Sequence, residues 1–250
     1  MMVCMLGTAL SLFSACTGLF GGIYDEAEDA PVSRSGLLYI DASSWTDWFY
    51  IDLPALADST TSSHALARTQ QPYAIPMALN GQSDGETGIY TYWFDVWGKG
   101  IAVNELRSYE PTDQQPAPDA WSLAVHRNNV RTNGGAVYET QLTDISQLTM
   151  SHDELATLTY TADEWTENAV WTDQSQMLNS MIGCQGIGIN KVLSSWLRLD
   201  VPPMPPAFTH NNHVFVLRLS DGSYAALQLV NYMSSRGVKC HLTISYKYPL

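Results

Sequence analysis

Short, mostly apolar runs of strand length, each ending at polar or turn-forming residues, recur along the chain after residue 36. They include GLLYIDA (36–42), DWFYIDL (47–53), HVFVLRL (213–219), SYAALQLVNYM (223–233) and KCHLTISYKY (239–248). Apolar runs of this length, bounded by turn signals, are typical of β-strands. Asp221-Gly222 and Arg236-Gly237 separate the last three runs. Because these dipeptides favour tight turns, the C-terminal part is predicted to form an antiparallel meander.

The stretch WSLAVHRNNVRTNGG, residues 121–135, begins with Trp121, Leu123 and Val125 at alternate positions and then becomes polar. The pattern places His126 on the face opposite Trp121, Leu123 and Val125, where it would serve as scaffold. We expect residues 121–130 and 135–142 to be paired strands joined across Thr132–Gly135. Residues 89–97, IYTYWFDVW, carry aromatic side chains on both faces and are predicted to form a strand buried on both sides.

Helix signals gather between residues 150 and 200. Ser151-x-x-Glu154 and Thr161-x-x-Glu164 both match a capping box, the signature of a helix N-terminus. Residues 174–182 are predicted to be a further short helix or an irregular loop. The fold class is therefore all-β: a single antiparallel β-rich domain, residues 36–250, with a few short helices in its middle region.

The N-terminus indicates export from the cytoplasm. Residues 1–15 are charge-free and mostly apolar, which fits a lipoprotein signal peptide. Ser14 and Ala15 precede Cys16 and resemble the bacterial lipobox, in which that cysteine is lipidated. An ordinary secretory signal with a chance cysteine is the alternative. Residues 16–35 would then be an acidic tether, and the lipid would be the chain's contact with the membrane.

Net charge and cysteine content limit the expected binding partners and disulfide bonds. The net charge of −13 and the lack of a basic stripe exclude nucleic acid as an expected partner. Without Cys4 and Cys16, two cysteines remain, Cys184 and Cys240. Two are too few for a disulfide framework, and they could form one bridge or stay as two buried thiols.

Two motifs that could indicate catalysis or metal binding lack the neighbouring elements or ligands that such sites need. Gly81-x-Ser83-x-Gly85 matches a nucleophile elbow, but a predicted strand rather than a helix follows it. His210-x-x-His213 lies in a loop without an obvious third ligand. No nucleophile–base set emerges, so the chain is not expected to be an enzyme.

Methionines are the more informative candidates. Met150 precedes the cap residue Ser151, while Met177 and Met181 lie in the segment QMLNSMIG. Thioether sulfur is a soft, uncharged ligand that suits haem iron. The structural alternative is packing: Met150 could staple onto Leu155, and methionine often fills gaps in cores.

The motif Trp121-x-x-Ala124-x-His126-Arg127 and the closing Asn231-Tyr232-Met233 resemble the HmuY-like family of bacterial haem-binding lipoproteins. The resemblance extends over most of the chain after residue 36. It implies a single all-β domain that captures haem (iron protoporphyrin IX) and passes it to an outer-membrane TonB-dependent receptor. The protein would be an outer-membrane lipoprotein at the cell surface or released from it, and assembly into a homo-oligomer is left open.

The resemblance also implies two axial iron ligands on loops of the middle region. Met150 and Met177 look like the methionine type, with His152 and Met181 as substitutes. Trp165, Trp171 and Tyr160 are close in sequence and could supply apolar walls, or could simply pack in the core. The alternative function is a surface β-sandwich lipoprotein that binds carbohydrate or protein.

Overall fold

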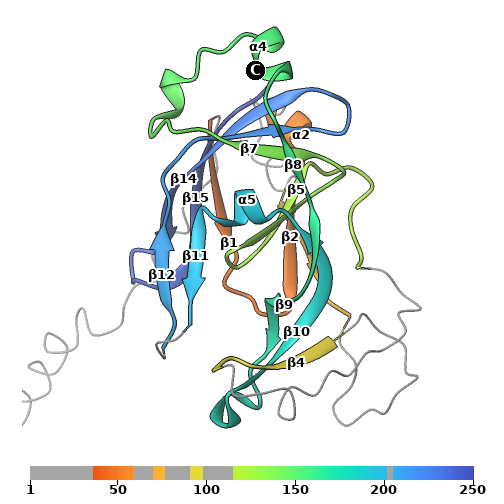
Figure 1. Ribbon diagram of the computed structural model, residues 1–250, viewed down its shortest axis with the longest axis vertical. Helices are drawn as coiled ribbons and strands as arrows, with labels where there is room; N and C mark the ends of the chain where they lie inside the picture. Colours follow the sequence, from red (N-terminus) through yellow and green to blue (C-terminus); the bar gives the residue numbers. More distant parts are fainter. Residues whose placement is uncertain (1–35, 59–69, 77–90, 98–114, 202–204) are drawn as a thin grey trace, which may run out of the picture. The chain divides into compact units, whose positions relative to one another are not determined.

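Strands dominate the computed structural model, which describes residues 36–58, 70–76, 91–97, 115–201 and 205–250 (Figure 1). The signal sequence, Cys16, the acidic tether and the Gly81-x-Ser83-x-Gly85 motif lie outside these residues. All the elements below belong to one compact unit, residues 33–250. Within the described ranges, no helix is long and apolar enough to cross a membrane.

The largest sheet has six strands, and every neighbouring pair in it is antiparallel. In order across the sheet they are β1 (Leu37–Asp41), β15 (Lys239–Lys247), β14 (Tyr224–Met233), β13 (Phe215–Arg218), β7 (Ala136–Glu139) and β8 (Thr161–Ala162). The last three strands of the chain are neighbours, so the predicted C-terminal meander is confirmed. Gly222 and Gly237 have positive φ angles in its two turns, as tight turns require.

The second sheet has four strands and corrects one prediction. Its order is β3 (Gln70–Ala74), β2 (Asp47–Ile51), β5 (Leu123–His126) and β6 (Asn129–Thr132). The predicted pairing of residues 121–130 with 135–142 is wrong, because the chain already reverses at Arg127 and Asn128, where His126 pairs with Asn129. Arg127 has φ 54°, which supplies the positive φ of a two-residue turn.

A third sheet, which we call the arm, has three strands. They are β4 (Thr91–Asp95), β10 (Met181–Ile189) and β9 (Glu164–Asp173), in that order. The predicted strand within residues 89–97 is confirmed as β4, which lies at the edge of the arm and pairs with β10. The predicted burial on both sides is not found at its described end, where Phe94 is half-buried and Trp97 is exposed. A two-stranded sheet, β11 (Leu197–Asp200) and β12 (Ala207–His210), completes the strands.

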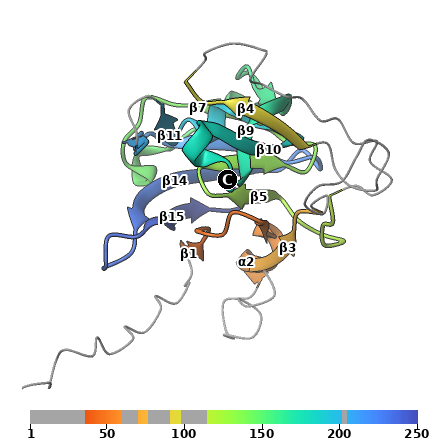
Figure 2. The same ribbon diagram turned by 90° about the horizontal axis from the view of Figure 1, so that it is seen from below.

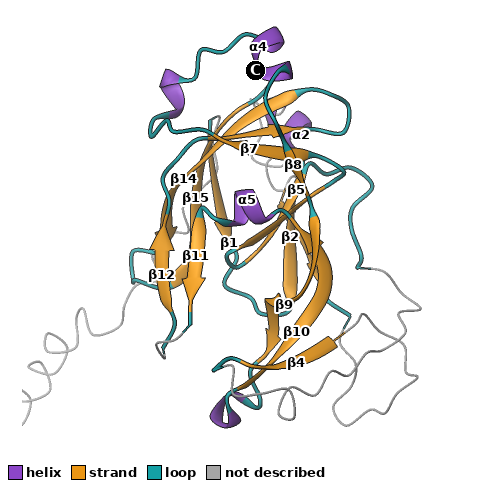
Figure 3. Cartoon of the chain, viewed as in Figure 1, coloured by secondary structure: helices purple, strands orange, loops and turns teal. Residues whose placement is uncertain are grey.

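The helices are short (Figure 3). They are α2 (Leu53–Asp58), η1 (Ile145–Gln147), α4 (His152–Ala156), η2 (Met177–Asn179) and α5 (Lys191–Ser194). The first capping box is confirmed: Ser151 caps α4, and the Glu154 carboxylate accepts the Ser151 backbone N–H at 2.7 Å. The second is wrong, because Thr161 and Glu164 form ladder pairs in β8 and β9. Pairing with neighbouring strands outweighs the local helix signal.

The four-stranded sheet is the middle layer of the domain. Its Ile51, Leu123 and Val125 share one apolar cluster with residues of the six-stranded sheet such as Phe215 and Leu227. Trp48, Tyr50 and Ala124 share a second cluster with arm residues, namely Val170, Ile187 and Ile189. Both faces of β2 and β5 are therefore covered.

Candidate functional site

Met150 belongs to an apolar cluster beneath α4. It lies directly before the cap Ser151 and packs, partly buried, in the cluster that contains Leu155. Met150 and Leu155 occupy the two positions of a hydrophobic staple, the residue before the cap and the fourth helical residue, and they share one cluster. The packing that the sequence suggested for Met150 is therefore present.

His152 is the first residue of α4 and lies beside Met150 in the chain. Its ring meets the ring of Tyr224 edge-on, with centroids 5.1 Å apart. The residue is otherwise exposed. The two candidate ligands at this place are therefore the partly buried thioether of Met150 and the exposed imidazole of His152, which contacts the Tyr224 ring.

Met177 and Met181 lie at the turn between β9 and β10, which we call the arm tip (residues 174–181). The Met181 backbone N–H donates to the Gln176 carbonyl at 3.2 Å, and the Ser180 N–H donates to the Met177 carbonyl at 2.9 Å. Ser180 has φ 63°, the left-handed conformation that ends η2. This tight turn holds both methionines, each partly exposed, at one place.

Two exposed apolar side chains lie in or next to the arm tip. Leu178 is 101% exposed and Trp97, at the end of β4, is 39% exposed. The Val96 N–H donates to the Ser180 carbonyl at 2.9 Å, which ties the end of β4 to the tip. Leu178 and Trp97 were not predicted from the sequence as site residues, because their exposure depends on how the strands pair. The signal available in the sequence was the charge-free run of residues 174–181.

The carboxylates next to the tip are turned towards the backbone. Asp173 accepts the Ser175 N–H at 2.7 Å, and Asp95, which is buried, accepts the Trp97 N–H at 2.9 Å. The tip therefore presents sulfur and apolar groups without a charge of its own, which suits a flat apolar molecule that carries a soft metal.

The structure places Met150 near its substitute His152, and Met177 near its substitute Met181. It keeps these two places apart. Met150 and His152 lie at the start of α4, whereas Met177 and Met181 belong to the turn between β9 and β10. Figures 1 and 3 show α4 and this turn at opposite ends of the domain. The ten-residue strand β9 alone spans roughly 30 Å between its ends. Ligation of one iron by Met150 and Met177 remains a prediction for solution measurements to test.

The three aromatic wall candidates have structural contacts of their own. The Tyr160 hydroxyl donates to the Leu155 carbonyl at 3.0 Å, and burial raises its pKa to about 12. Trp171 stacks against Trp45 with ring centroids 6.3 Å apart. Trp165 is 54% exposed on β9, and its Nε1 donates to Glu167 Oε1 at 3.3 Å.

His126 is fully buried between the middle sheet and the arm. Its Nε2 donates to the Trp45 carbonyl at 3.0 Å, and its ring lies 5.4 Å from that of Trp48. Burial lowers its pKa from 6.5 to about 4, so the ring is neutral at physiological pH. Arg127 covers the Trp45 ring at 3.7 Å. These contacts fit the scaffold role predicted for this motif.

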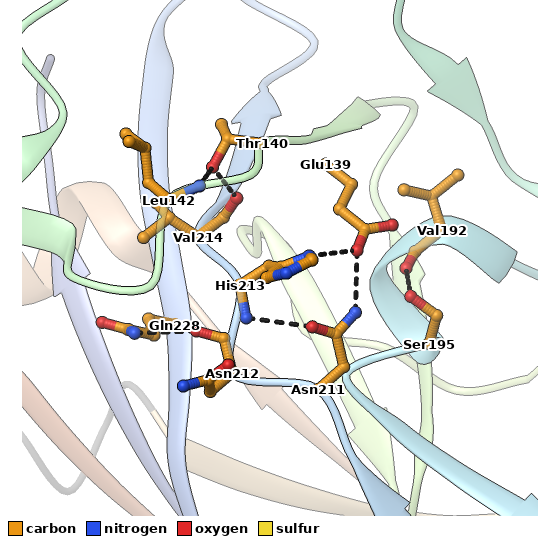
Figure 4. Close-up of polar contacts among 10 residues, drawn as sticks. All are labelled: Glu139, Thr140, Leu142, Val192, Ser195, Asn211, Asn212, His213, Val214 and Gln228. Carbon is orange, nitrogen blue, oxygen red and sulfur yellow. Dashed lines mark hydrogen bonds and ion pairs between the residues drawn. The ribbon is translucent and has the colours of Figure 1, made fainter.

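The His210-x-x-His213 pair is divided between two separate contacts. His213 Nδ1 donates to Glu139 Oε1 at 2.8 Å, and Asn211 donates to the same oxygen at 2.8 Å (Figure 4). His210 Nε2 donates to the Leu229 carbonyl at 2.8 Å. Among the described residues, no group of three or more His, Cys, Asp or Glu side chains could hold a metal ion. The network links the β12–β13 connection to β7, and sequence spacing alone did not reveal it.

The two cysteines that the sequence left open are both free and buried. Burial raises the pKa of the Cys184 thiol and of the Cys240 thiol, so both stay protonated at neutral pH. They pack as small apolar groups rather than as a bridge.

Comparisons with known proteins agree with this fold. A family model described as HmuY protein matches residues 44–246. A solved structure described as a "putative lipoprotein" from Bacteroides fragilis NCTC 9343 is 28% identical, with a TM-score of 0.59 over 86% of this chain and 89% of that chain. Another, a "putative HmuY-like heme binding protein" from Bacteroides vulgatus ATCC 8482, is 32% identical, with a TM-score of 0.57 over 86% of this chain and 91% of that chain.

A more distant neighbour shares the fold alone. The apo HmuY analog of Tannerella forsythia is 19% identical, with a TM-score of 0.61 over 86% of this chain and 95% of that chain. No curated protein is similar enough to count as a match.

Proposed function

Because the chain belongs to the HmuY family, we propose that it binds haem at the bacterial surface and passes it to an outer-membrane TonB-dependent receptor. The observation that carries the proposal is the family match over residues 44–246. A neighbour that is 32% identical and described as heme-binding supports it. We assign the chain a non-enzymatic role, in which haem is cargo.

The proposal includes a lipid anchor. Residues 1–15 would direct export, Cys16 would carry the lipid, and residues 16–35 would hold the β-domain away from the membrane. The Bacteroides fragilis neighbour described as a lipoprotein supports this arrangement.

Met177 is the ligand that the geometry favours, with Met181 as its substitute. Both are partly exposed at the arm tip, and Leu178 and Trp97 add apolar surface there. A thioether needs no proton and no charge to bind iron, so it can act in this neutral environment. Two residues of one tight turn cannot reach both faces of a flat ring. We therefore propose that the arm tip supplies one axial ligand.

Met150 is proposed for the second axial position, with His152 as its substitute. Met150 would have to leave the cluster beneath α4, and the arm tip would have to approach that end of the domain or of a second molecule. Loss of the Met150 packing costs stability, so haem would have to offset that cost. Spectra of single variants separate this arrangement from one in which Met177 acts with another residue.

A redox-resolved titration tests the proposed function. Thioether sulfur donates less charge than imidazole and favours ferrous iron. We expect haem to shift its Soret band on addition of the protein, and reduced haem to bind more tightly than oxidised haem with a sharper low-spin spectrum. The absence of any Soret shift would exclude haem binding. Equal affinity in the two states, or a bis-histidine spectrum, would refute methionine ligation.

Single and double substitutions test the ligands. We expect Met177→Ala to lower affinity for ferrous haem and Met150→Ala with Met177→Ala to abolish the low-spin spectrum. Met233→Ala is the matched control, because it removes an exposed thioether from a different part of the domain. If Met177→Ala leaves the spectrum intact while Met181→Ala removes it, the substitute is the ligand. A double variant with an unchanged spectrum would mean that other residues bind the iron.

The alternative, a lipoprotein that binds carbohydrate or protein, has one observation in its favour. Trp165 is 54% exposed, and exposed indole rings can stack on sugars. The same absorbance titration separates the two functions, because a sugar-binding protein would not shift the Soret band.

A further inference from the structure

The arm tip holds two thioethers, although one haem could use only one of them at this place. Met177 and Met181 are both partly exposed, and they belong to the same turn between β9 and β10. Figure 2 shows these two strands side by side with β4 in the arm. Ligation of haem by a single sulfur does not account for the second methionine.

Hydrogen bonds fix the backbone of both methionines. The Met181 N–H donates to the Gln176 carbonyl at 3.2 Å, and the Ser180 N–H donates to the Met177 carbonyl at 2.9 Å. With Ser180 at φ 63°, these two bonds are those of a Schellman motif, which closes the end of a helix. A methionine side chain has three rotatable bonds, so both sulfur atoms can turn towards one ion.

The oxygen atoms of the arm tip are already acceptors within the protein. Protein N–H groups donate at 2.9–3.2 Å to four backbone carbonyls, those of Gln174, Gln176, Met177 and Ser180. The Gln176 side-chain oxygen accepts the Asn179 amide at 2.9 Å. A hard cation such as Ca²⁺ or Mg²⁺ takes about six or more oxygen ligands, and it would have to displace these bonds.

The surroundings of the two sulfur atoms carry no charge of their own. Residues 174–181 contain no Asp, Glu, Lys, Arg, His or Cys. Leu178, which lies between the methionines in the chain, is 101% exposed, and Trp97 beside the tip is 39% exposed. Because no carboxylate of the tip balances the charge of a bound ion, a monovalent cation is favoured over a divalent one.

We propose that Met177 and Met181 together bind the soft monovalent cation Cu(I) at the arm tip. Soft, uncharged sulfur selects Cu(I), whereas Cu(II) prefers nitrogen and oxygen ligands in a square arrangement. A thioether has no proton to lose, so the site is ready at any physiological pH. The proposal goes beyond haem binding and does not depend on it.

A competition titration without oxygen tests the site. The probe is Cu(I) held by the coloured chelator bicinchoninate, with ascorbate as reductant. The protein is the full chain with Cys16→Ser, which cannot carry the lipid. We expect the protein to withdraw about one Cu(I) per chain from the chelator. Met177→Leu and Met181→Leu should each raise the dissociation constant about tenfold or more, because either change leaves a single sulfur.

The dependence on pH separates thioethers from other ligands. Thiol and imidazole sites bind metal more tightly as the pH rises, because their protons leave. After correction for protonation of the chelator, the affinity of the arm tip for Cu(I) should stay constant within about twofold between about pH 5.5 and pH 8. Cu(II), added without reductant, should bind equally to the unmodified chain and to Met177→Leu.

Two matched variants serve as controls. Met233→Leu removes a thioether that is 37% exposed on β14, and Cys184→Ala removes the buried thiol of β10. Both should bind Cu(I) within about twofold of the unmodified chain, since neither side chain belongs to the site. Leucine is close to methionine in volume, so the folds of the Leu variants are retained, and thermal unfolding checks this.

Several results would overturn the proposal. They are failure of the unmodified chain to withdraw Cu(I), unchanged binding by both arm-tip variants, an equal loss with Met233→Leu or Cys184→Ala, and an affinity that rises steadily with pH. Loss of Cu(I) binding in Met181→Leu with an unchanged haem spectrum would support a site that needs both sulfur atoms. A haem titration without a Soret shift would refute the proposed function and leave the Cu(I) result valid.

Discussion

The burial and the pKa of His126 are set by the layers of the domain that enclose its strand. The side chain is fully buried, donates one hydrogen bond to the Trp45 carbonyl, and has its other ring nitrogen, Nδ1, buried without a hydrogen-bond partner. A charged imidazole is unfavourable in such a place because it has lost its hydration. Burial therefore holds the pKa of His126 at about 4. The residue contributes structure as a neutral donor.

This low pKa predicts acid sensitivity. Between about pH 6.5 and pH 4 the unfolded chain binds a proton at His126 that the folded chain does not, so the free energy of unfolding falls as the pH falls. The loss attributable to this group approaches about 3 kcal/mol below pH 4. Urea unfolding at several pH values should show a steeper decline for the unmodified chain than for His126→Gln. The haem spectrum of folded His126→Gln should stay unchanged. Parallel pH profiles would contradict the assigned cause.

At the scale of elements, two turns decide which sheet each strand joins. The positive φ of Arg127 closes the β5–β6 hairpin, and the Gly134-Gly135 pair then carries the chain from the middle sheet to β7 in the six-stranded sheet. A Cβ atom on Gly135 would lie 2.7 Å from the Arg218 carbonyl oxygen. Close approach of the two backbones, rather than flexibility, therefore requires glycine at this crossing.

Alanine substitutions at Gly135 and Gly188 should distinguish steric crowding of the added Cβ atom from the general effect of replacing glycine. We expect Gly135→Ala to lower the free energy of unfolding by roughly 2 kcal/mol, because a backbone atom of β13 must move to admit the Cβ. Gly188→Ala is the control within the arm, since its Cβ would meet its nearest neighbour at an ordinary 3.9 Å. It should change stability by less than about 1 kcal/mol. Thermal or urea unfolding of the two variants provides the comparison, and equal losses would refute the crowding argument.

At the scale of the whole molecule, the arm is bonded to the middle sheet through buried polar groups as well as apolar contacts. Trp48 Nε1 donates to Gln185 Oε1 at 2.8 Å, and Gln185 in turn donates to Gln115 at 2.9 Å. Asn129 donates to the Ala169 carbonyl at 2.9 Å. These bonds join the base of the arm to the scaffold, while the arm tip extends beyond them.

Removal of the acceptor should loosen the arm. In Gln185→Met the buried Trp48 N–H has no acceptor, which costs about 1–3 kcal/mol. In a Trp48→Phe background the same change should cost less, because that donor is already absent. Hydrogen exchange should quicken in β9 and β10 more than in β14 and β15. Additive stability losses in the two backgrounds would show that the bond does not couple the layers.

The sequence by itself determined most of the strands and part of the caps. Apolar runs of strand length, separated by turn residues, predicted β1, β2, β13, β14 and β15, because both signals are local in the sequence. The capping box at Ser151 and Glu154 predicted α4 for a similar local reason, since both partners lie within one turn. The family motifs led to haem as the candidate ligand.

The tertiary structure decided which faces are covered and which sites come together. Alternation placed His126 on a polar face, but whether water or the arm meets that face depends on contacts between segments far apart in the chain. The same holds for Thr161 and Glu164, which strand partners drew into β8 and β9. It also holds for the candidate ligands: Met150 directly precedes α4 and Met177 lies in the turn between β9 and β10, and Figure 1 shows these two parts at opposite ends of the domain. Local spacing specifies the face of an element, whereas its neighbours in space are specified by packing that no short stretch of sequence contains.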